Sequence, residues 1–137
     1  MEKITILVDI NRSIEFVWKA LTQAEWITQW NFASEDWACP KASIQLEVGK
    51  RFNYRMEAKD GSFGFDFEGT FTQVDLGKSY AYVMDDGRQV KLTLEVIDGK
   101  TRVIESFDPE NENPVELQRE GWLAILTNLK KVVEEKL

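Results

Sequence analysis

Four short turns constrain the possible folds of this chain more than any other feature of its sequence. Each turn places a glycine where a tight hairpin requires a positive φ. The four are KDGS (59–62), LGKS (76–79), DDGR (85–88) and DGKT (98–101). The segments around them are rich in β-branched and aromatic residues, which predicts five consecutive antiparallel strands at about 44–58, 62–75, 78–84, 89–97 and 101–107. Gly49 indicates a bulge or bend within the first of these strands.

Shorter elements are expected before this run of strands. The segment ITILVDI (4–10) is typical of a strand, and residues 13–21 have the pattern of a first helix. The segment TQAE matches a capping box with Thr22 as N-cap, which predicts a second short helix over 22–30. Residues 31–43, which contain a proline and scattered polar groups, are expected to form a loop.

The end of the chain has the pattern of one long amphipathic helix. Asn113 is a suitable N-cap, Pro114 suits the first helical position, and the apolar residues after them recur at helical spacing. A helix of about twenty residues is the only element large enough to cover the apolar face of the sheet. Gly121, beside the apolar stripe, would allow close approach by another backbone or by a ligand. The sequence therefore predicts an α+β fold of order β-α-α-β-β-β-β-β-α, in a single domain of residues 1–137.

The inward face of the predicted sheet carries many aromatic residues. Alternation along the strands places on one face Phe52, Tyr54, Met56, Phe63, Phe65, Phe67, Phe71, Tyr80, Tyr82, Met84, Val90, Leu92, Leu94, Val96, Val103 and Phe107. Large flat rings interdigitate less densely than aliphatic side chains and favour cavities with rigid walls. Two interpretations therefore stay open: the rings fill an ordinary core, or they line a binding cavity.

Glu105 is the unexpected residue of this face. It shares the inward side of its strand with two apolar neighbours, so its carboxylate would lie in apolar surroundings. Burial would raise its pKa, unless it finds partners such as Tyr54, Tyr82, Gln118 or Arg119. Glu105 is therefore a polar group inside a ligand pocket, a general acid, a satisfied structural carboxylate, or a residue at an exposed strand end.

Composition excludes several classes of function. The net charge of −7 disfavours nucleic acid and anionic membranes as partners. The absence of histidine removes the common nucleophile–histidine dyads, and with the single Cys39 it makes a transition-metal site unlikely to form, so we expect no metal and no cofactor. No apolar stretch has the length of a leader or of a membrane span, and a lone cysteine forms no internal disulfide. We therefore expect a cytoplasmic protein without a catalytic constellation.

Several motifs resemble the START-like, or SRPBCC, superfamily, and most closely the proteins similar to the C-terminal domain of the heat-shock-protein-90 ATPase activator. The Val-Trp pair of the first helix matches Val17-Trp18, the tryptophan that ends the second helix matches Trp30, and the Gly-Trp of the last helix matches Gly121-Trp122. The segments that carry the resemblance are SIEFVWKALTQAEWITQW (13–30), VGKRFNYRM (48–56), FEGTFTQVDLGKSYAY (67–82) and ENPVELQREGWLAILTNLKKVVE (112–134). One departure is Arg12-Ser13, where the family usually has a proline before the first helix, and another is Gly49-Lys50 in place of Gly-Gly.

The resemblance implies a helix-grip (START-like, Bet v-like) fold, with a cavity between the sheet and the C-terminal helix that often holds an apolar ligand. Our first hypothesis is therefore a binding protein for a small apolar or amphipathic molecule. The alternatives are a protein-interaction module with an exposed apolar patch around Phe32 and Trp37, and, with least support, a cavity enzyme that uses Glu105. The expected ligand-binding residues are Trp30, Trp37, Phe52, Tyr54, Phe65, Phe67, Tyr82, Glu105, Phe107, Gln118 and Trp122.

Overall fold

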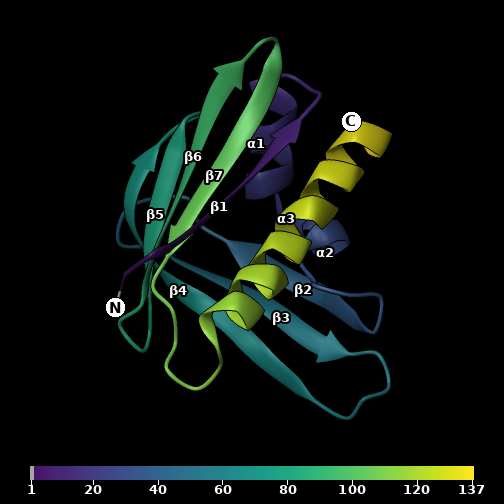
Figure 1. Cartoon of the computed structure of the whole chain (residues 1–137), viewed down its shortest axis with the longest axis vertical. Helices are drawn as coiled ribbons and strands as arrows, with labels where there is room; N and C mark the ends of the chain where they lie inside the picture. Colours follow the sequence, from purple (N-terminus) through teal and green to yellow (C-terminus); the bar gives the residue numbers. More distant parts are fainter. Residues whose placement is uncertain (1) are drawn as a thin grey trace.

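Seven antiparallel strands form one curved sheet, and a long C-terminal helix crosses its inner face (Figure 1). The structure is a computed structural model that describes residues 2–137. Its elements are β1 (Ile4–Ile10), α1 (Ile14–Thr22), α2 (Ala24–Trp30), β2 (Trp37–Ile44), β3 (Arg51–Ala58), β4 (Gly64–Asp75), β5 (Ser79–Met84), β6 (Gln89–Ile97), β7 (Lys100–Phe107) and α3 (Val115–Lys136). The predicted α+β helix-grip fold is confirmed, because the sheet curls around α3 and the elements follow the expected order with one additional strand, β2.

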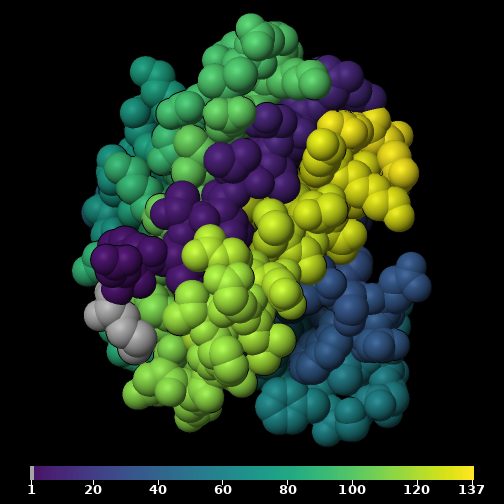
Figure 2. Space-filling view, in the orientation of Figure 1, coloured from purple at the N-terminus to yellow at the C-terminus, as the bar shows by residue number. Residues whose placement is uncertain are grey.

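The strand order is β1-β7-β6-β5-β4-β3-β2. Neighbours from β3 to β7 are the four consecutive hairpins that the four turns predicted, and all four turn glycines have positive φ. Strand β2 adds a fifth hairpin with β3. The first strand instead pairs with the last, Ile4 opposite Phe107. Helices α1 and α2 therefore carry the chain from one edge of the sheet to the other. Figure 2 shows β1 (purple) lying alongside α3 (green to yellow) on the surface.

The region before the run of hairpins differs from its prediction. Residues 37–44 form strand β2 rather than a loop, and the expected strand over 44–58 is divided between β2 and β3. Pro40 is tolerated because β2 is an edge strand and its register shifts between Ala38 and Lys41. Gly49, at φ +85°, lies in the connection between β2 and β3, where its N–H donates to the Phe71 carbonyl at 2.8 Å. The glycine bend was thus predicted correctly, but it separates two strands.

Two predicted helix caps are also wrong. Thr22 ends α1 instead of starting α2, because its hydroxyl donates back to the Trp18 carbonyl at 2.7 Å. Pro114, rather than Asn113, holds the N-cap position of α3. The side chain of Asn113 instead donates to Glu110, and its carbonyl accepts a hydrogen bond from the Gln118 amide. Both errors shift a helix boundary by one or two residues and leave the helices in place.

Most of the predicted inward residues are buried, but three are exposed. Phe63, Phe65 and Val96 lie close to the tips of their hairpins, which extend beyond the part of the sheet that α3 covers (Figure 1). Phe63 is 62% exposed and Val96 is 67% exposed. Strand alternation sets the direction of a side chain but not whether another element lies over it, which is why the sequence pattern missed these three.

Candidate functional site

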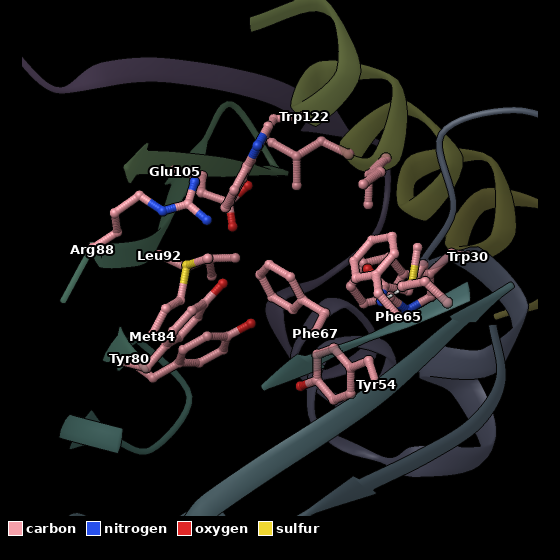
Figure 3. A pocket seen from close by; sticks show the side chains of 15 residues that line it. Trp30, Tyr54, Phe65, Phe67, Tyr80, Met84, Arg88, Leu92, Glu105 and Trp122 are labelled. Atoms are coloured by element: carbon pink, nitrogen blue, oxygen red, sulfur yellow. Dashed lines mark hydrogen bonds between the residues drawn. The ribbon is translucent and has the colours of Figure 1, made fainter. Parts of the chain in front are cut away.

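A cavity of about 260 Å³ lies between the aromatic part of the sheet and the first half of α3 (Figure 3). Strands β3 to β7 form its floor and walls, while α3 and the end of α2 close the opposite side. Of the residues expected to bind a ligand, seven line it: Trp30, Tyr54, Phe65, Phe67, Tyr82, Glu105 and Trp122. The structure therefore brings together the larger part of the predicted set around one space.

Phe52 and Phe107 lie behind the cavity wall, in the core. Phe52 is 2% exposed, and its ring packs against the rings of Tyr54, Phe67, Phe71 and Tyr82. This close approach requires Gly69 on the neighbouring strand, where a Cβ would lie 3.2 Å from Phe52 and 2.6 Å from a backbone oxygen. Phe107 is fully buried and stacks on the indole ring of Trp122 at 3.9 Å. Both phenylalanines fix the residues that form the cavity surface.

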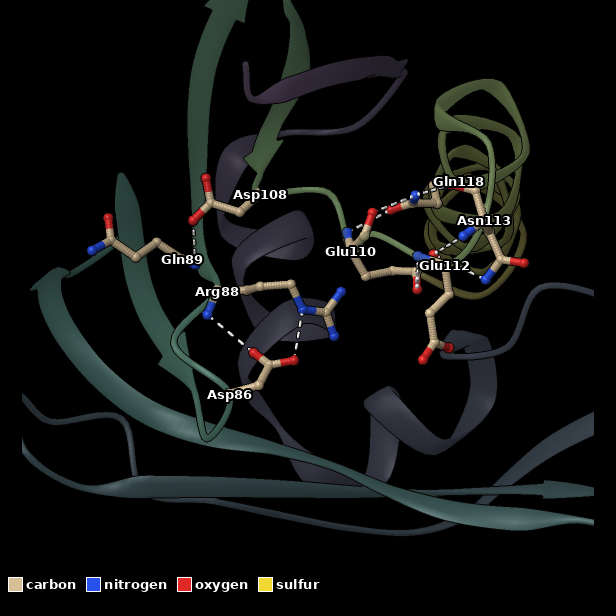
Figure 4. Close-up of polar contacts among 8 residues, drawn as sticks. All are labelled: Asp86, Arg88, Gln89, Asp108, Glu110, Glu112, Asn113 and Gln118. Carbon is tan, nitrogen blue, oxygen red and sulfur yellow. Dashed lines mark hydrogen bonds and ion pairs between the residues drawn. The ribbon is translucent and has the colours of Figure 1, made fainter. Parts of the chain in front are cut away.

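Two other expected residues lie away from the cavity. Trp37 is at the start of β2. Its ring packs edge-on against those of Phe63 and Phe65, with ring centroids 6.1 Å and 5.9 Å apart. Gln118 is buried because it joins α3 to the preceding connection: its amide accepts from the Glu110 N–H and donates to the Glu110 and Asn113 carbonyls (Figure 4). The role of Gln118 in the geometry is therefore to hold the start of the helix.

Gly121, expected to allow close approach by another backbone or by a ligand, has no atom of another segment within 4 Å of the position a Cβ would take. The first half of α3 is therefore held over the sheet by its large side chains. Trp122 makes the principal contact: its ring stacks on Phe107 and lies edge-on to Phe67, with the ring centroids of Trp122 and Phe67 5.9 Å apart. This indole forms one wall of the cavity, directly across from the strands (Figure 3).

Trp30 connects the cavity to the short helices. It is 5% exposed, and its indole N–H donates to the Ala20 carbonyl at 2.8 Å, which ties the end of α2 to α1. Next to it, the amide of Asn31 donates to the sulfur of Met56 at 3.3 Å. Trp30, which matches the family's helix-ending tryptophan, therefore joins two helices through its N–H and also lines the cavity.

Polar groups gather at the opposite end of the cavity, near Glu105. Its carboxylate points into the space from β7, and Tyr80 and Met84 face the same end (Figure 3). The carboxyl is half-buried among the surrounding rings, and this burial raises the pKa of Glu105 to about 8. Burial, and then the nearby charge of Glu105, likewise raise the pKa of Tyr82, so the phenol stays neutral near neutral pH.

These groups have no protein partners among residues 2–137. Neither the Glu105 carboxylate nor the hydroxyls of Tyr54, Tyr80 and Tyr82 form a side-chain hydrogen bond there, although partners for Glu105 were considered on the sequence. Arg119, one of those partners, donates instead to the Thr5 carbonyl at 3.0 Å. Because no side-chain polar atom in the described part is sealed off without a partner, these oxygens keep their access to the cavity space.

Arg88 completes this end of the cavity from the turn between β5 and β6. Its Nε donates to Asp86 at 2.8 Å, and the guanidinium extends toward the connection between β7 and α3 (Figure 4). The pKa of Glu110 is lowered mainly by hydrogen bonds from Asn113, and Asp108 accepts from the Gln89 N–H at 2.7 Å. Arg88 is therefore paired with one acidic group, Asp86, whereas the Glu105 carboxylate is not paired.

Sequence reasoning missed the rest of the lining, which is Asn31, Met56, Tyr80, Met84, Arg88, Leu92, Ile125 and Leu126. For most of these a signal was present: the four strand residues lie on the predicted inward face, and the two α3 residues lie in the apolar stripe. No local pattern marks Asn31 or Arg88. Asn31 reaches the cavity from the end of α2 and Arg88 from the turn between β5 and β6, and both placements depend on the tertiary fold.

The polar groups that line the cavity are the Glu105 carboxyl, the Arg88 guanidinium, the Asn31 amide and three tyrosine phenols. No group of three or more His, Cys, Asp or Glu side chains in residues 2–137 is arranged to hold a metal ion. Cys39 is buried, and burial raises the pKa of its thiol, which opposes thiolate formation. Within the same residues, no helix is long and apolar enough to cross a membrane.

Comparison with known proteins agrees with this architecture. The family model of the Activator of Hsp90 ATPase homolog 1-like proteins matches residues 11–134. The chain belongs to this family. Comparison with curated proteins gives no significant match.

Solved structures support the assignment. An AHSA1-like protein from Aeromonas hydrophila is 42% identical, with a TM-score of 0.88 over 96% of this chain and 93% of its own. A protein from Cytophaga hutchinsonii is 41% identical, with a TM-score of 0.84 over 97% of this chain and 92% of its own. The Aha1 dimer from Colwellia psychrerythraea is 20% identical and covers 98% of this chain and 97% of its own, with a TM-score of 0.74, so it shows likeness of fold alone.

Proposed function

We propose that this AHSA1-like protein binds a small, partly apolar molecule in the cavity between the sheet and α3. The observation that carries the proposal is the cavity itself, which aromatic rings line on most sides and unpaired oxygens face at one end. A cavity with a few placed polar groups among apolar walls is the usual form of a small-molecule site.

The size of the cavity limits the ligand. A benzene molecule occupies an apolar cavity of about 150 Å³, so the 260 Å³ here suits one ring with a short polar chain. The free energy of binding would come mainly from apolar surface removed from water, at about 25 cal/mol per Å². A long acyl chain would require the first half of α3 to move.

Titration with 2-phenylethanol, followed by two-dimensional NMR of the amide groups, tests this function. We expect saturable shifts at residues of the cavity wall, such as Tyr54 and Phe67, and none at the outer face of the sheet. Ile125→Trp, which places an indole in the cavity, should abolish them. Leu117→Trp is the matched control, because Leu117 is 55% exposed on the same helix. Binding that survives Ile125→Trp unchanged, or no saturable shift at all, would overturn the proposal.

A second candidate function, a contact with a protein partner, has one observation in its favour. Trp37, Phe63 and Phe65 form an aromatic cluster at the end of the β3–β4 hairpin, and two of its rings are more than 40% exposed. If this cluster mediates self-association, the apparent mass in light scattering should rise with concentration and fall to that of a monomer in Phe63→Ser. A constant monomer mass in the unsubstituted chain would remove this form of the proposal.

A further inference from the structure

We infer that the cavity selects cationic amines, with the ammonium group held against Glu105 and the apolar part between Trp122, Phe67 and Tyr82. This inference deepens the proposed function and rests on it. Nothing in the family assignment supplies the charge of the ligand. The polar groups of the cavity differ in whether they already have partners within the protein.

The two charged residues of the lining differ in this respect. Arg88 donates from its Nε to Asp86 at 2.8 Å, so its positive charge already has an acidic partner within the protein. The carboxylate of Glu105 forms no ion pair and no hydrogen bond within residues 2–137. A ligand that enters therefore meets one unbalanced acidic group, and an ammonium group supplies both the charge and the N–H donors that it lacks.

The walls beside Glu105 suit a cation as well. Trp122 and Phe67 meet edge to face at 5.9 Å, and Phe67 meets Tyr82 at 6.2 Å, so aromatic faces and edges surround the space. Aromatic faces attract cations, and this attraction increases when water is excluded. The phenol oxygens of Tyr80 and Tyr82 can accept further N–H groups, since neither is used within the protein.

Occupation by an amine must also change the protonation of Glu105. Without ligand, burial keeps its pKa at about 8, so the carboxyl is mostly neutral at pH 7. The groups that face it are the Arg88 guanidinium and the phenols of Tyr54, Tyr80 and Tyr82, whose pKa values burial raises above the ordinary value. Among these carboxyl and phenol groups only Glu105 therefore titrates between pH 6 and pH 8, and an ammonium group that pairs with its carboxylate should displace its proton.

Three probes of equal shape test the inference: 2-phenylethylamine, 2-phenylethanol and 3-phenylpropionate, titrated calorimetrically at several pH values. We expect the amine to bind at least tenfold more tightly than the alcohol at pH 8, and the carboxylate more weakly than either. For an acid of pKa about 8, affinity for the amine should rise about ninefold from pH 6 to pH 7 and about fivefold more to pH 8, with about 0.9 proton released at pH 7. Proton release is measured by repeating the titration in buffers of different ionisation enthalpy.

Glu105→Gln should abolish the preference for the amine and its pH dependence while keeping the binding of 2-phenylethanol, which also shows that the variant is folded. Glu95→Gln is the matched control, because it removes the same charge from the exposed face of β6. Equal affinity for amine and alcohol, a preference for the carboxylate, or an amine preference that survives Glu105→Gln would overturn the inference and leave the proposed function standing. If none of the three probes binds, the proposed function itself fails.

Discussion

Two regions of the sheet's inner face share the same alternation of inward and outward side chains, but one is tightly packed and the other leaves a cavity. Near β1, the second half of α3 and the helix α1 fill the space, so that Val17, Val103, Leu129 and Val133 are fully buried. Over β3 to β5, the first half of α3 spans aromatic rings and leaves a cavity. Aliphatic side chains interdigitate to the density of a protein interior, whereas large rings in contact with one another leave space between them. The difference shows that close packing and open space occupy separate parts of one core.

The largest effect should come from truncating matched leucine and isoleucine side chains on α3. Leu129→Ala leaves a void in the packed region and should lower the free energy of unfolding by about 3–5 kcal/mol. Ile125→Ala enlarges a space that already exists, so we expect a loss of about 1 kcal/mol or less. Equilibrium denaturation of both variants in urea measures the difference. Equal losses would mean that the cavity region is packed as tightly as the rest.

The pH dependence of stability should isolate the cavity region. The pKa of Glu105 is raised from 4.5 to about 8 in the folded protein, so the folded state binds the proton more tightly than the unfolded state. Stability should therefore fall as the pH rises from 5 to 8, by on the order of 3 kcal/mol. Surface carboxylates such as Asp9, whose pKa the Arg102 guanidinium lowers, lose their contribution only on acidification below this window.

Glu105→Gln should remove this slope. The variant should match the unsubstituted chain near pH 5 and exceed it in stability near pH 8, as denaturation curves at four pH values would show. Parallel pH profiles for the two proteins would contradict the burial of a titrating carboxyl in the cavity.

Enlarging a side chain gives the opposite test of the same contrast. Val103→Leu adds a methylene to a position that is fully buried and should cost about 1–3 kcal/mol. Ile125→Phe adds more atoms, but toward the cavity, so thermal unfolding should show no loss of stability. A comparable loss in both variants would indicate that the cavity wall is as rigidly filled as the core.

The smallest effect concerns the two tryptophans that border the cavity. Trp30→Phe removes the indole N–H that donates to the buried Ala20 carbonyl, and should cost about 1–2 kcal/mol beyond the loss of ring volume. Trp122→Phe keeps a ring on Phe107 and breaks no such bond, so its loss should be smaller. Denaturation midpoints of the two variants measure the difference. A larger loss of stability in Trp122→Phe than in Trp30→Phe would contradict the prediction.

The sequence predicts the fold because its signals are local. Glycine turns, strand alternation and the apolar stripe of α3 each act over a few residues, and together they leave few architectures. The cavity is predicted less completely. Glu105 and Trp122 could be placed on the correct side, since periodicity sets direction. Arg88, Asn31 and the displacement of Trp37 depend on how distant segments meet, and no local pattern encodes that.

The errors have the same physical origin. Thr22 has the sequence of a cap, but its hydroxyl found a carbonyl one turn earlier in α1. Residues 37–44 have a weak strand pattern and become β2 because β3 supplies a pairing edge. Gln118 was considered as a partner for Glu105 in the cavity, yet α3 turns it toward Glu110.

The pairing of β1 with β7 has a consequence for the order of folding. Every other neighbour in the sheet is joined by a short connection, whereas Ile4 must meet Phe107 across nearly the whole chain. Closing so long a loop costs more entropy than forming a hairpin, and contacts far apart in sequence slow folding. We therefore expect the hairpins of β4 to β7 to form in the transition state and β1 to dock late, with φ-values near zero in β1 and high in β5 and β6. During synthesis, β1 would therefore stay unpaired until β7 has emerged from the ribosome.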